Sequence, residues 1–190
     1  MKKLNKIIIS NAQEAYINRE WAVVAPLYDE LSQKGCQLPE KNKVQWVISL
    51  KKIQDYSSAL RLISLFLSMN NTSSIGLWLF HSGECKQSLG EYSQAIDCYE
   101  KALASYQNKK TIFYRLSQCH EKLRDYKSAL ICIEQASSLS QSLLINAQLA
   151  SVHYKQKNWS ACAKVFEELF ERFSIESFRP QWVYCYADSL

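Results

Sequence analysis

The stretch "LGEYSQAI" at 89–96 decides the fold, because the chain repeats it in altered form on both sides. The related stretches "IQDYSSAL" at 53–60 and "LRDYKSAL" at 123–130 each contain an apolar residue, an acid, a tyrosine and an alanine in that order. Tryptophans stand at the corresponding places further out, so that five aromatic residues recur every 33–36 residues. These anchor aromatics are Trp21, Tyr56, Tyr92, Tyr126 and Trp159. Such a period is typical of repeat architectures.

Each repeat divides into two helical patterns. Small or apolar residues follow the anchor aromatic at offsets of 3, 7 and 10, as Ala95, Tyr99 and Ala102 follow Tyr92. These offsets place the three side chains on one face of a helix. A small or modest residue stands nine positions before each anchor, within an expected preceding helix: Ala12, Val47, Gly83, Ser117 and Ala150. The scarcity of glycine (4) and proline (3) also favours helices over an all-β fold.

The third copy carries Gly83, Gly90, Tyr92, Ala95 and Tyr99 at the spacing that marks the tetratricopeptide repeat (TPR) family, which the chain resembles over residues 4–173. The resemblance implies an all-α fold, a right-handed α–α superhelix in which antiparallel helix pairs form a TPR solenoid. We expect one array over residues 1–190. Its repeats are expected at 4–36, 40–71, 75–109, 110–141 and 142–175, with a partial sixth unit at 179–190.

Two regions depart from this pattern. Pro26 falls inside the expected second helix of the first copy, so we expect that helix to be kinked or to start late. At the other end, "QWVYCYADSL" reads as a helix without a partner and with an apolar outer face, whereas arrays normally end in a polar one. An interface with another molecule or a following domain is therefore expected at Trp182, Tyr184, Tyr186 and Leu190.

The seven cysteines do not indicate a metal site or a disulfide framework. Their number is odd, none forms a CxxC pair, and the isoleucine run after the first lysines is too short for a secretory signal. Cys85 and Cys119 lie 34 residues apart, as do Cys98 and Cys132, which indicates recurring structural positions filled by small buried thiols. We expect a cytoplasmic location, with neither membrane span nor cofactor.

Catalytic motifs are lacking in the sequence, which contains no GxGxxG, GxxxxGK[ST], HExxH or GxSxG pattern. His81 and Cys85 form an i, i+4 pair with Glu84 beside it, but two ligands do not make a metal site. We therefore predict that these 190 residues have no catalytic function.

The TPR resemblance implies a concave groove lined by residues 15, 12, 8, 5 and 4 positions before each anchor aromatic. These positions hold six lysines and two acids, together with aromatic side chains that we expect to be exposed. Such a groove suits an extended acidic or mixed peptide; alternatively, the lysines are solvated and bind nothing tightly. The candidate partner-binding residues are Lys41, Lys51, Lys52, Phe80, Glu84, Tyr114, Gln118, Lys122, Tyr154 and Lys155.

The predicted function is a non-catalytic scaffold for protein–protein contacts. By analogy alone, we expect it to be the N-terminal module of a larger protein, such as a bacterial enzyme of surface-polysaccharide synthesis. A free-standing adaptor or chaperone that homodimerises through its last helix is an alternative, and a groove for an anionic polymer is another. The net charge of +5 permits nucleic acid, but lysine greatly outnumbers arginine, which disfavours that partner.

Overall fold

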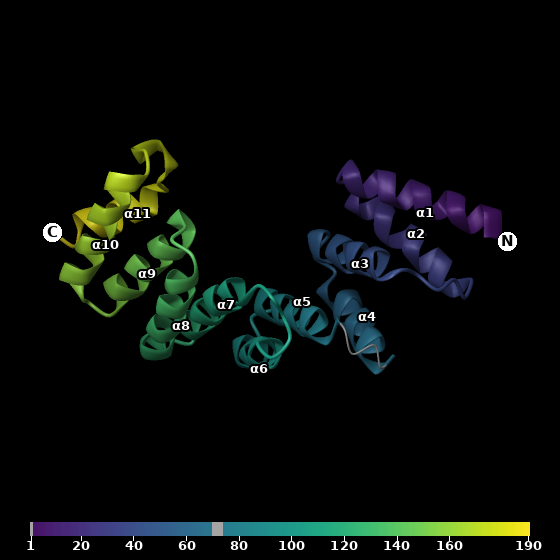
Figure 1. The fold of residues 1–190 in the computed structure, drawn as a ribbon, viewed down its shortest axis with the longest axis horizontal. Helices are drawn as coiled ribbons and strands as arrows, with labels where there is room; N and C mark the ends of the chain where they lie inside the picture. The colour runs from purple at the N-terminus through teal and green to yellow at the C-terminus, as the bar shows by residue number, and fades with distance from the viewer. Residues whose placement is uncertain (1, 70–73) are drawn as a thin grey trace. The chain divides into compact units, whose positions relative to one another are not determined.

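The computed structural model describes residues 2–69 and 74–190, and in them every regular element is a helix (Figure 1). The chain divides into two compact units, residues 1–90 and 91–190, here called the N-terminal and C-terminal units. The N-terminal unit contains α1 (Lys2–Ile17), α2 (Trp21–Gln33), α3 (Glu40–Lys52), α4 (Tyr56–Ser68) and α5 (Ile75–Ser88). The C-terminal unit contains α6 (Tyr92–Ala102), α7 (Lys109–Lys122), α8 (Tyr126–Leu139), α9 (Leu143–Lys155), α10 (Trp159–Arg172), the short 3₁₀ helix η2 (Ile175–Ser177) and α11 (Pro180–Ala187).

Each anchor aromatic is the first residue of an even-numbered helix, from Trp21 in α2 to Trp159 in α10. We call these even-numbered helices the second helices, and α1, α3, α5, α7 and α9 the first helices. Within each unit, consecutive helices pack against one another. The prediction of helical pairs joined just before the anchor is therefore confirmed.

The joint before each anchor has the same backbone conformation in every repeat. The residue two positions before the anchor has a positive φ: Arg19 (62°), Gln54 (64°), Gly90 (81°), Arg124 (62°) and Lys157 (61°). In four joints the next amide donates back to the carbonyl five residues earlier, as Asp125 N–H does to His120 at 2.9 Å. This pattern is a Schellman motif, which ends the first helix with a left-handed residue.

The second helices then begin at side-chain caps in three repeats. Asp55, Asp125 and Asn158 each accept a hydrogen bond from the amide three residues on, at 3.0, 3.1 and 3.4 Å. Glu91 makes no such bond at the start of α6. The acid in the repeated stretch is thus a cap where it is aspartate, because its shorter side chain reaches the free amides of the first turn.

The core of the N-terminal unit contains a row of aromatic rings. Tyr28, Trp46, Phe66 and Trp78 lie with successive ring centroids 6.3, 6.4 and 5.0 Å apart. Helix α2 begins at Trp21 and runs to Gln33 with Pro26 inside it. Of the two outcomes expected for this helix, a late start is excluded, since its first residue is the anchor aromatic as in the other repeats, and a kink at Pro26 stays a prediction.

In the C-terminal unit, α11 packs on α9 and α10. Trp182 and Tyr186 contact a core that includes Phe166 and Phe178, whereas Tyr184 and Leu190 are 66% and 81% exposed. Of the four residues predicted as an interface, two thus contribute to the fold of the unit and two face solvent. Within the described ranges, no helix combines the length and apolar character needed to cross a membrane.

Candidate partner-binding face

Two predicted partner-binding residues of the N-terminal unit contact each other. Lys51, in the last turn of α3, donates from Nζ to Glu84 Oε2 on α5. His81 lies beside this pair, with its Nδ1 3.1 Å from Lys51 Nζ and 3.1 Å from Glu84 Oε2. The side chains of Lys51 and Glu84 are each only 17% exposed, so the pair is largely shielded from water. The ammonium of Lys51 is therefore already paired within the N-terminal unit.

Burial and neighbouring charge shift the pKa of Glu84 in opposite directions. Burial favours the protonated form of Glu84, but the hydrogen bond from His81 and the charge of Lys51 outweigh it and lower the pKa of Glu84 to about 2. Burial lowers the pKa of His81. Its other ring nitrogen, Nε2, is buried and has no hydrogen-bond partner among the described residues. The carboxylate of Glu84 is thus charged near neutral pH.

The C-terminal unit contains a corresponding charge pair. Glu121 on α7 accepts hydrogen bonds from Lys155 Nζ and from Gln148 Nε2, both on α9. The paired residues are 34 positions apart, against 33 for Lys51 and Glu84, so each pair joins first helices of successive repeats. Predicted groove positions thus share a face within each unit.

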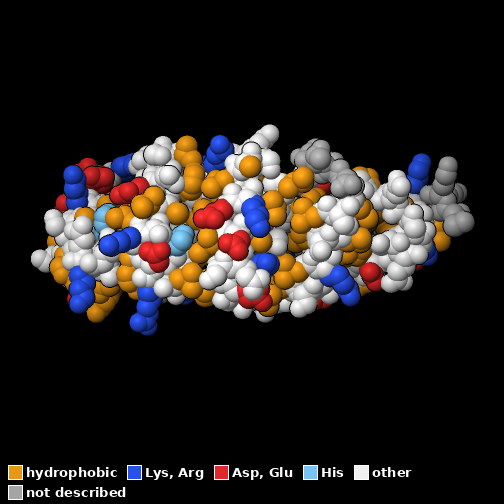
Figure 2. Space-filling model, turned by 90° about the horizontal axis from the view of Figure 1, so that it is seen from below, with side chains coloured by type: hydrophobic (Ala, Val, Ile, Leu, Met, Phe, Trp, Pro, Cys, Tyr) orange, Lys and Arg blue, Asp and Glu red, His pale blue; other side chains and the backbone are white. Residues whose placement is uncertain are grey.

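These pairs change the charge balance expected from the sequence. Both acids at predicted groove positions, Glu84 and Glu121, bind a lysine. Lys41, Lys52 and Lys122 are exposed, and no carboxylate of the described residues lies within 4 Å of them. Figure 2 shows one side of the molecule, on which basic and acidic side chains are interspersed among hydrophobic ones. The candidate face is therefore mixed, with fewer free lysines than the sequence suggested.

The expectation of exposed aromatic residues was wrong for Phe80, which is buried at 5% exposure. Tyr114 is half-buried and accepts a hydrogen bond from Gln118 Nε2 at 3.0 Å, so two predicted residues contact each other on α7. Burial raises the pKa of Tyr114. These side chains are held in place by neighbours within their own unit.

Tyr154 is half-buried and packs edge-on against the anchor Trp159, with ring centroids 5.1 Å apart. Its hydroxyl donates to Asp188 Oδ2 at 2.6 Å, and this bond raises the pKa of Tyr154 to about 12. Tyr16 makes the equivalent contact with the anchor Trp21 at 5.2 Å. The residue five positions before a tryptophan anchor therefore supports that anchor.

The possible metal ligands of the described residues are dispersed, and several of the cysteines are buried. No group of three or more His, Cys, Asp or Glu side chains in them is placed to hold a metal ion. Burial raises the pKa of the Cys85 thiol to about 11 and that of Cys119 to about 12. Cys85, Cys98 and Cys119 are buried, as the repeat spacing predicted, and Cys132 is half-buried. Buried thiols of high pKa are poor nucleophiles.

Sequence reasoning missed His81 as part of an ion-pair network and Gln148 as a partner of Glu121. A usable signal was present, because opposite charges recur at spacings close to the repeat length. Residues one repeat apart on neighbouring first helices lie side by side in a solenoid, so such spacings predict contacts.

Comparisons with known proteins agree with this geometry. The family profile described as "Tetratricopeptide repeat" matches residues 79–109 and 111–143. A search of curated proteins gives no match.

Several solved structures have the same fold. MamA from Desulfovibrio magneticus RS-1 (residues 41 to the end) is similar at a TM-score of 0.77 and 14% identity, covering 88% of this chain and 93% of that one. A tetratricopeptide repeat protein from Parabacteroides merdae gives 0.76 and 14%, covering 97% and 72%. YrrB, described as a TPR protein with an unusual peptide-binding site, gives 0.66 and 19%, covering 78% and 74%. The predicted all-α solenoid of helix pairs is confirmed.

Proposed function

Since this chain is a helical repeat protein with tetratricopeptide repeats, we propose that it is a non-catalytic scaffold that binds an acidic or mixed partner peptide on its first helices. The fold itself supports a role in protein–protein interaction in general. The partner chemistry is the specific part of the proposal.

The main support is that lysine–glutamate pairs join successive first helices in both units. These pairs mark one face of each unit and fix the spacing of its helices. Side chains on such a face are held in position before a partner arrives, which reduces the entropy lost on binding.

The free charges on this face favour acidic groups in the partner. Lys41 and Lys52 are exposed on α3 of the N-terminal unit, and Lys122 is exposed at the end of α7 in the C-terminal unit. In the C-terminal unit, the half-buried Tyr114 and Gln118 add an aromatic surface and an amide on the same helix. Exposed lysines attract acidic partners at long range, and aromatic and amide groups bind them at short range.

The experiment is a fluorescence anisotropy titration of the full chain with a labelled peptide of alternating Glu and Leu or Phe. We expect Lys41→Glu with Lys52→Glu, and separately Lys122→Glu, to weaken binding about fivefold per lysine at low salt. Lys164→Glu on the second helix α10 is the matched control, because it makes the same charge change away from the first helices. Lys51 is unsuitable for this test, since its reversal would place two carboxylates side by side.

Equal weakening by Lys164→Glu would show that only net charge matters and would refute the assignment of this face. Dextran sulfate binding as tightly as the peptide would instead favour the predicted alternative, an anionic polymer. The predicted setting, the N-terminal module of a bacterial surface-polysaccharide enzyme, stays a prediction from analogy.

A second candidate is self-association through the last helix and the residues after it, because Tyr184 of α11 and Leu190 beyond its end remain exposed. Two large apolar side chains in water favour burial against another surface. Light scattering after size exclusion is expected to show a dimer that Tyr184→Glu with Leu190→Glu dissociates. A monomer at all concentrations up to about 100 μM, well above the Kd of a stable dimer, would reject this candidate.

A further inference from the structure

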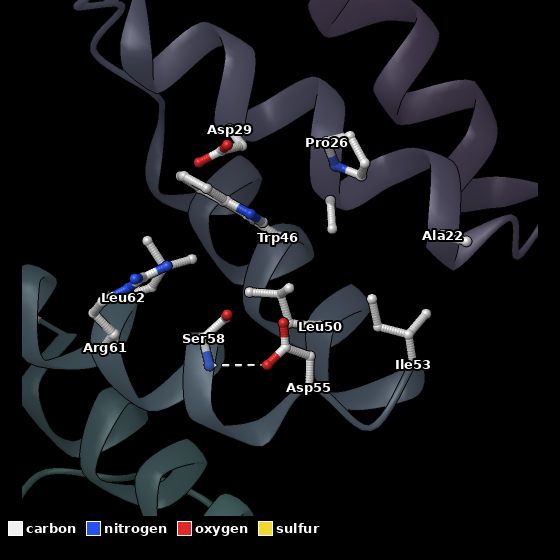
Figure 3. A pocket seen from close by; sticks show the side chains of 11 residues that line it. Ala22, Pro26, Asp29, Trp46, Leu50, Ile53, Asp55, Ser58, Arg61 and Leu62 are labelled. Atoms are coloured by element: carbon white, nitrogen blue, oxygen red, sulfur yellow. Dashed lines mark hydrogen bonds between the residues drawn. The ribbon is translucent and has the colours of Figure 1, made fainter.

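A cavity of about 380 Å³ lies among α2, α3 and α4 of the N-terminal unit (Figure 3). Its walls come from two second helices, and Trp46 of the first helix α3 lies between them. None of the predicted groove positions lines this cavity, so it is separate from the candidate face. Its volume is that of a small ligand site and is ample for one large side chain.

The interior of the cavity is apolar. Trp46, Leu50 and Ala25 line it and are each buried at 6% exposure or less. Pro26 and Leu62 contribute the facing walls from α2 and α4. Short alanine side chains on α2 leave the space open, because they do not extend across to α4. An apolar group that entered would leave water and contact the rigid indole of Trp46.

Acidic groups lie at the border of the cavity. Asp29 of α2 and Asp55 at the start of α4 both line it. Each carboxylate makes one hydrogen bond, Asp29 Oδ2 with Gln33 Nε2 at 2.8 Å and Asp55 Oδ1 with the amide of Ser58 at 3.0 Å, which leaves acceptor capacity on both.

The backbone of α2 contains a carbonyl that lacks its usual helical partner. The carbonyl of Ala22, another lining residue, cannot receive the usual helical hydrogen bond, since residue 26 is proline and has no amide proton. Arg61 is the one basic residue of the lining, and it has no carboxylate within 4 Å among the described residues. The two carboxylates that line the cavity thus outnumber the single guanidinium.

We propose that this cavity is a docking site for a partner polypeptide that inserts one large apolar side chain and carries a basic residue next to it. The apolar side chain packs on Trp46, and the adjacent ammonium or guanidinium pairs with Asp29 or Asp55. Arg61 donates to a main-chain carbonyl of the bound segment. This cavity favours a basic ligand, whereas the candidate face of the first helices favours an acidic one. The proposed docking site and the proposed function can therefore succeed or fail separately.

The test uses three capped dipeptides as probes of the full chain: acetyl-Phe-Lys-amide, acetyl-Phe-Glu-amide and acetyl-Ala-Lys-amide. Titrations are followed by nuclear magnetic resonance of the Trp46 indole N–H and of the backbone amides of α2. We expect the Phe-Lys probe to shift these signals with a Kd in the millimolar range, as about ten to twenty contacting atoms permit. The Phe-Glu probe is expected to bind at least about fivefold more weakly, and the Ala-Lys probe not to saturate.

Two variants separate the site from the fold. Ala22→Leu, at an exposed position that lines the cavity, is expected to occupy part of it and to weaken the shifts caused by the Phe-Lys probe. Asp29→Asn with Asp55→Asn keeps the side-chain shapes and the helix cap, and is expected to make the Phe-Lys and Phe-Glu probes bind equally. Asp97→Asn on α6 is the matched control and should leave all three titrations unchanged.

The proposal is overturned if the Phe-Lys probe binds no more tightly than the Phe-Glu probe. It is also overturned if the double asparagine variant keeps the wild-type preference, or if the shifts fall on predicted groove positions such as Lys41 and Lys122 and leave Trp46 unchanged. Because the double variant is isosteric, its result stands even where Ala22→Leu alters the packing of α2.

Discussion

The same kind of charge pair occurs in both units, but in different surroundings. Lys51 and Glu84 are each 17% exposed and both contact His81, whereas Lys155 is 41% exposed and its partner Glu121 12%. Coulomb attraction is stronger and desolvation more costly where water is excluded. Breaking the pair of the N-terminal unit should therefore change the free energy of unfolding strongly, and its contribution should depend on pH. Breaking the pair of the C-terminal unit should change the free energy of unfolding only weakly.

The largest expected difference comes from removing each lysine. Lys51→Met leaves the Glu84 carboxylate shielded without the ammonium of Lys51, and we expect a loss of about 2–3 kcal/mol in the free energy of unfolding. Lys155→Met removes a half-exposed ammonium and leaves Glu121 with its hydrogen bond from Gln148, so it should cost about 1 kcal/mol or less. Urea unfolding monitored by circular dichroism measures both. Equal losses would show that burial does not distinguish the pairs.

The next effect is the pH dependence of the N-terminal unit. The folded-state pKa of Glu84 is about 2, below the ordinary value of 4.5, so its contribution to stability is complete above pH 4.5 and is lost as the pH falls towards 2. His81, whose pKa burial lowers from 6.5, adds a loss in the same direction that begins below about pH 6.5. From the shift of Glu84 we expect at most about 3 kcal/mol.

The measurement is urea unfolding of wild type and Glu84→Gln between pH 3 and 7. The variant, which cannot take up this proton, should show a smaller loss on acidification than wild type. Parallel curves for the two proteins would contradict the low pKa of Glu84.

A smaller effect is expected at the joints, where the two units can be compared directly. Gly90→Ala should lower the free energy of unfolding by about 1 kcal/mol, because φ is 81° there. A β-carbon at Gly90 meets no atom within 4 Å, so the cost is one of backbone conformation. Arg124→Gly, at φ 62° in the C-terminal unit, should raise stability by up to about 1 kcal/mol. A destabilising Arg124→Gly would indicate that its side chain makes a contact that matters.

The smallest effect concerns Tyr154 of the candidate face. Its hydrogen bond to Asp188 raises its pKa to about 12, and Asp188→Asn should bring the pKa back towards 10. Ultraviolet absorption of tyrosinate during alkaline titration measures this change. We expect no measurable change in melting temperature, and an unaltered titration would mean that the bond does not persist in solution.

The helices and their joints were predictable because the same residue pattern occurs several times along the chain. An alanine three positions after a tyrosine and an aromatic at the start of each second helix are local signals, and helix α6 with Tyr92 and Ala95 shows both. The left-handed conformation of the joint could be predicted only at Gly90, since arginine, glutamine and lysine, which occupy this position in the other repeats, do not favour a positive φ. The hydrogen bonds of the Schellman motif stabilise that conformation whatever the side chain.

The candidate site was less predictable because its properties depend on contacts between repeats. The sequence placed Lys51 and Glu84 on one face, but their pairing needs the register of α3 against α5. The cavity beside Trp46 depends on how far apart α2 and α4 lie, which no residue spacing gives. Phe80 shows the same limit, since its position in the groove pattern did not reveal its burial.

The internal lysine–glutamate pairs also bear on how fast a partner associates. A lysine ammonium that is paired with a carboxylate of the same chain forms a dipole with it. The electric field of such a pair is small beyond a Debye length, which is about 8 Å at physiological salt. Long-range attraction towards the first helices is thus left to isolated charges such as Lys41 and Lys52 in one unit and Lys122 in the other. Association should accordingly show a shallow dependence on ionic strength, and differences in affinity among partners should reside mainly in their dissociation rates.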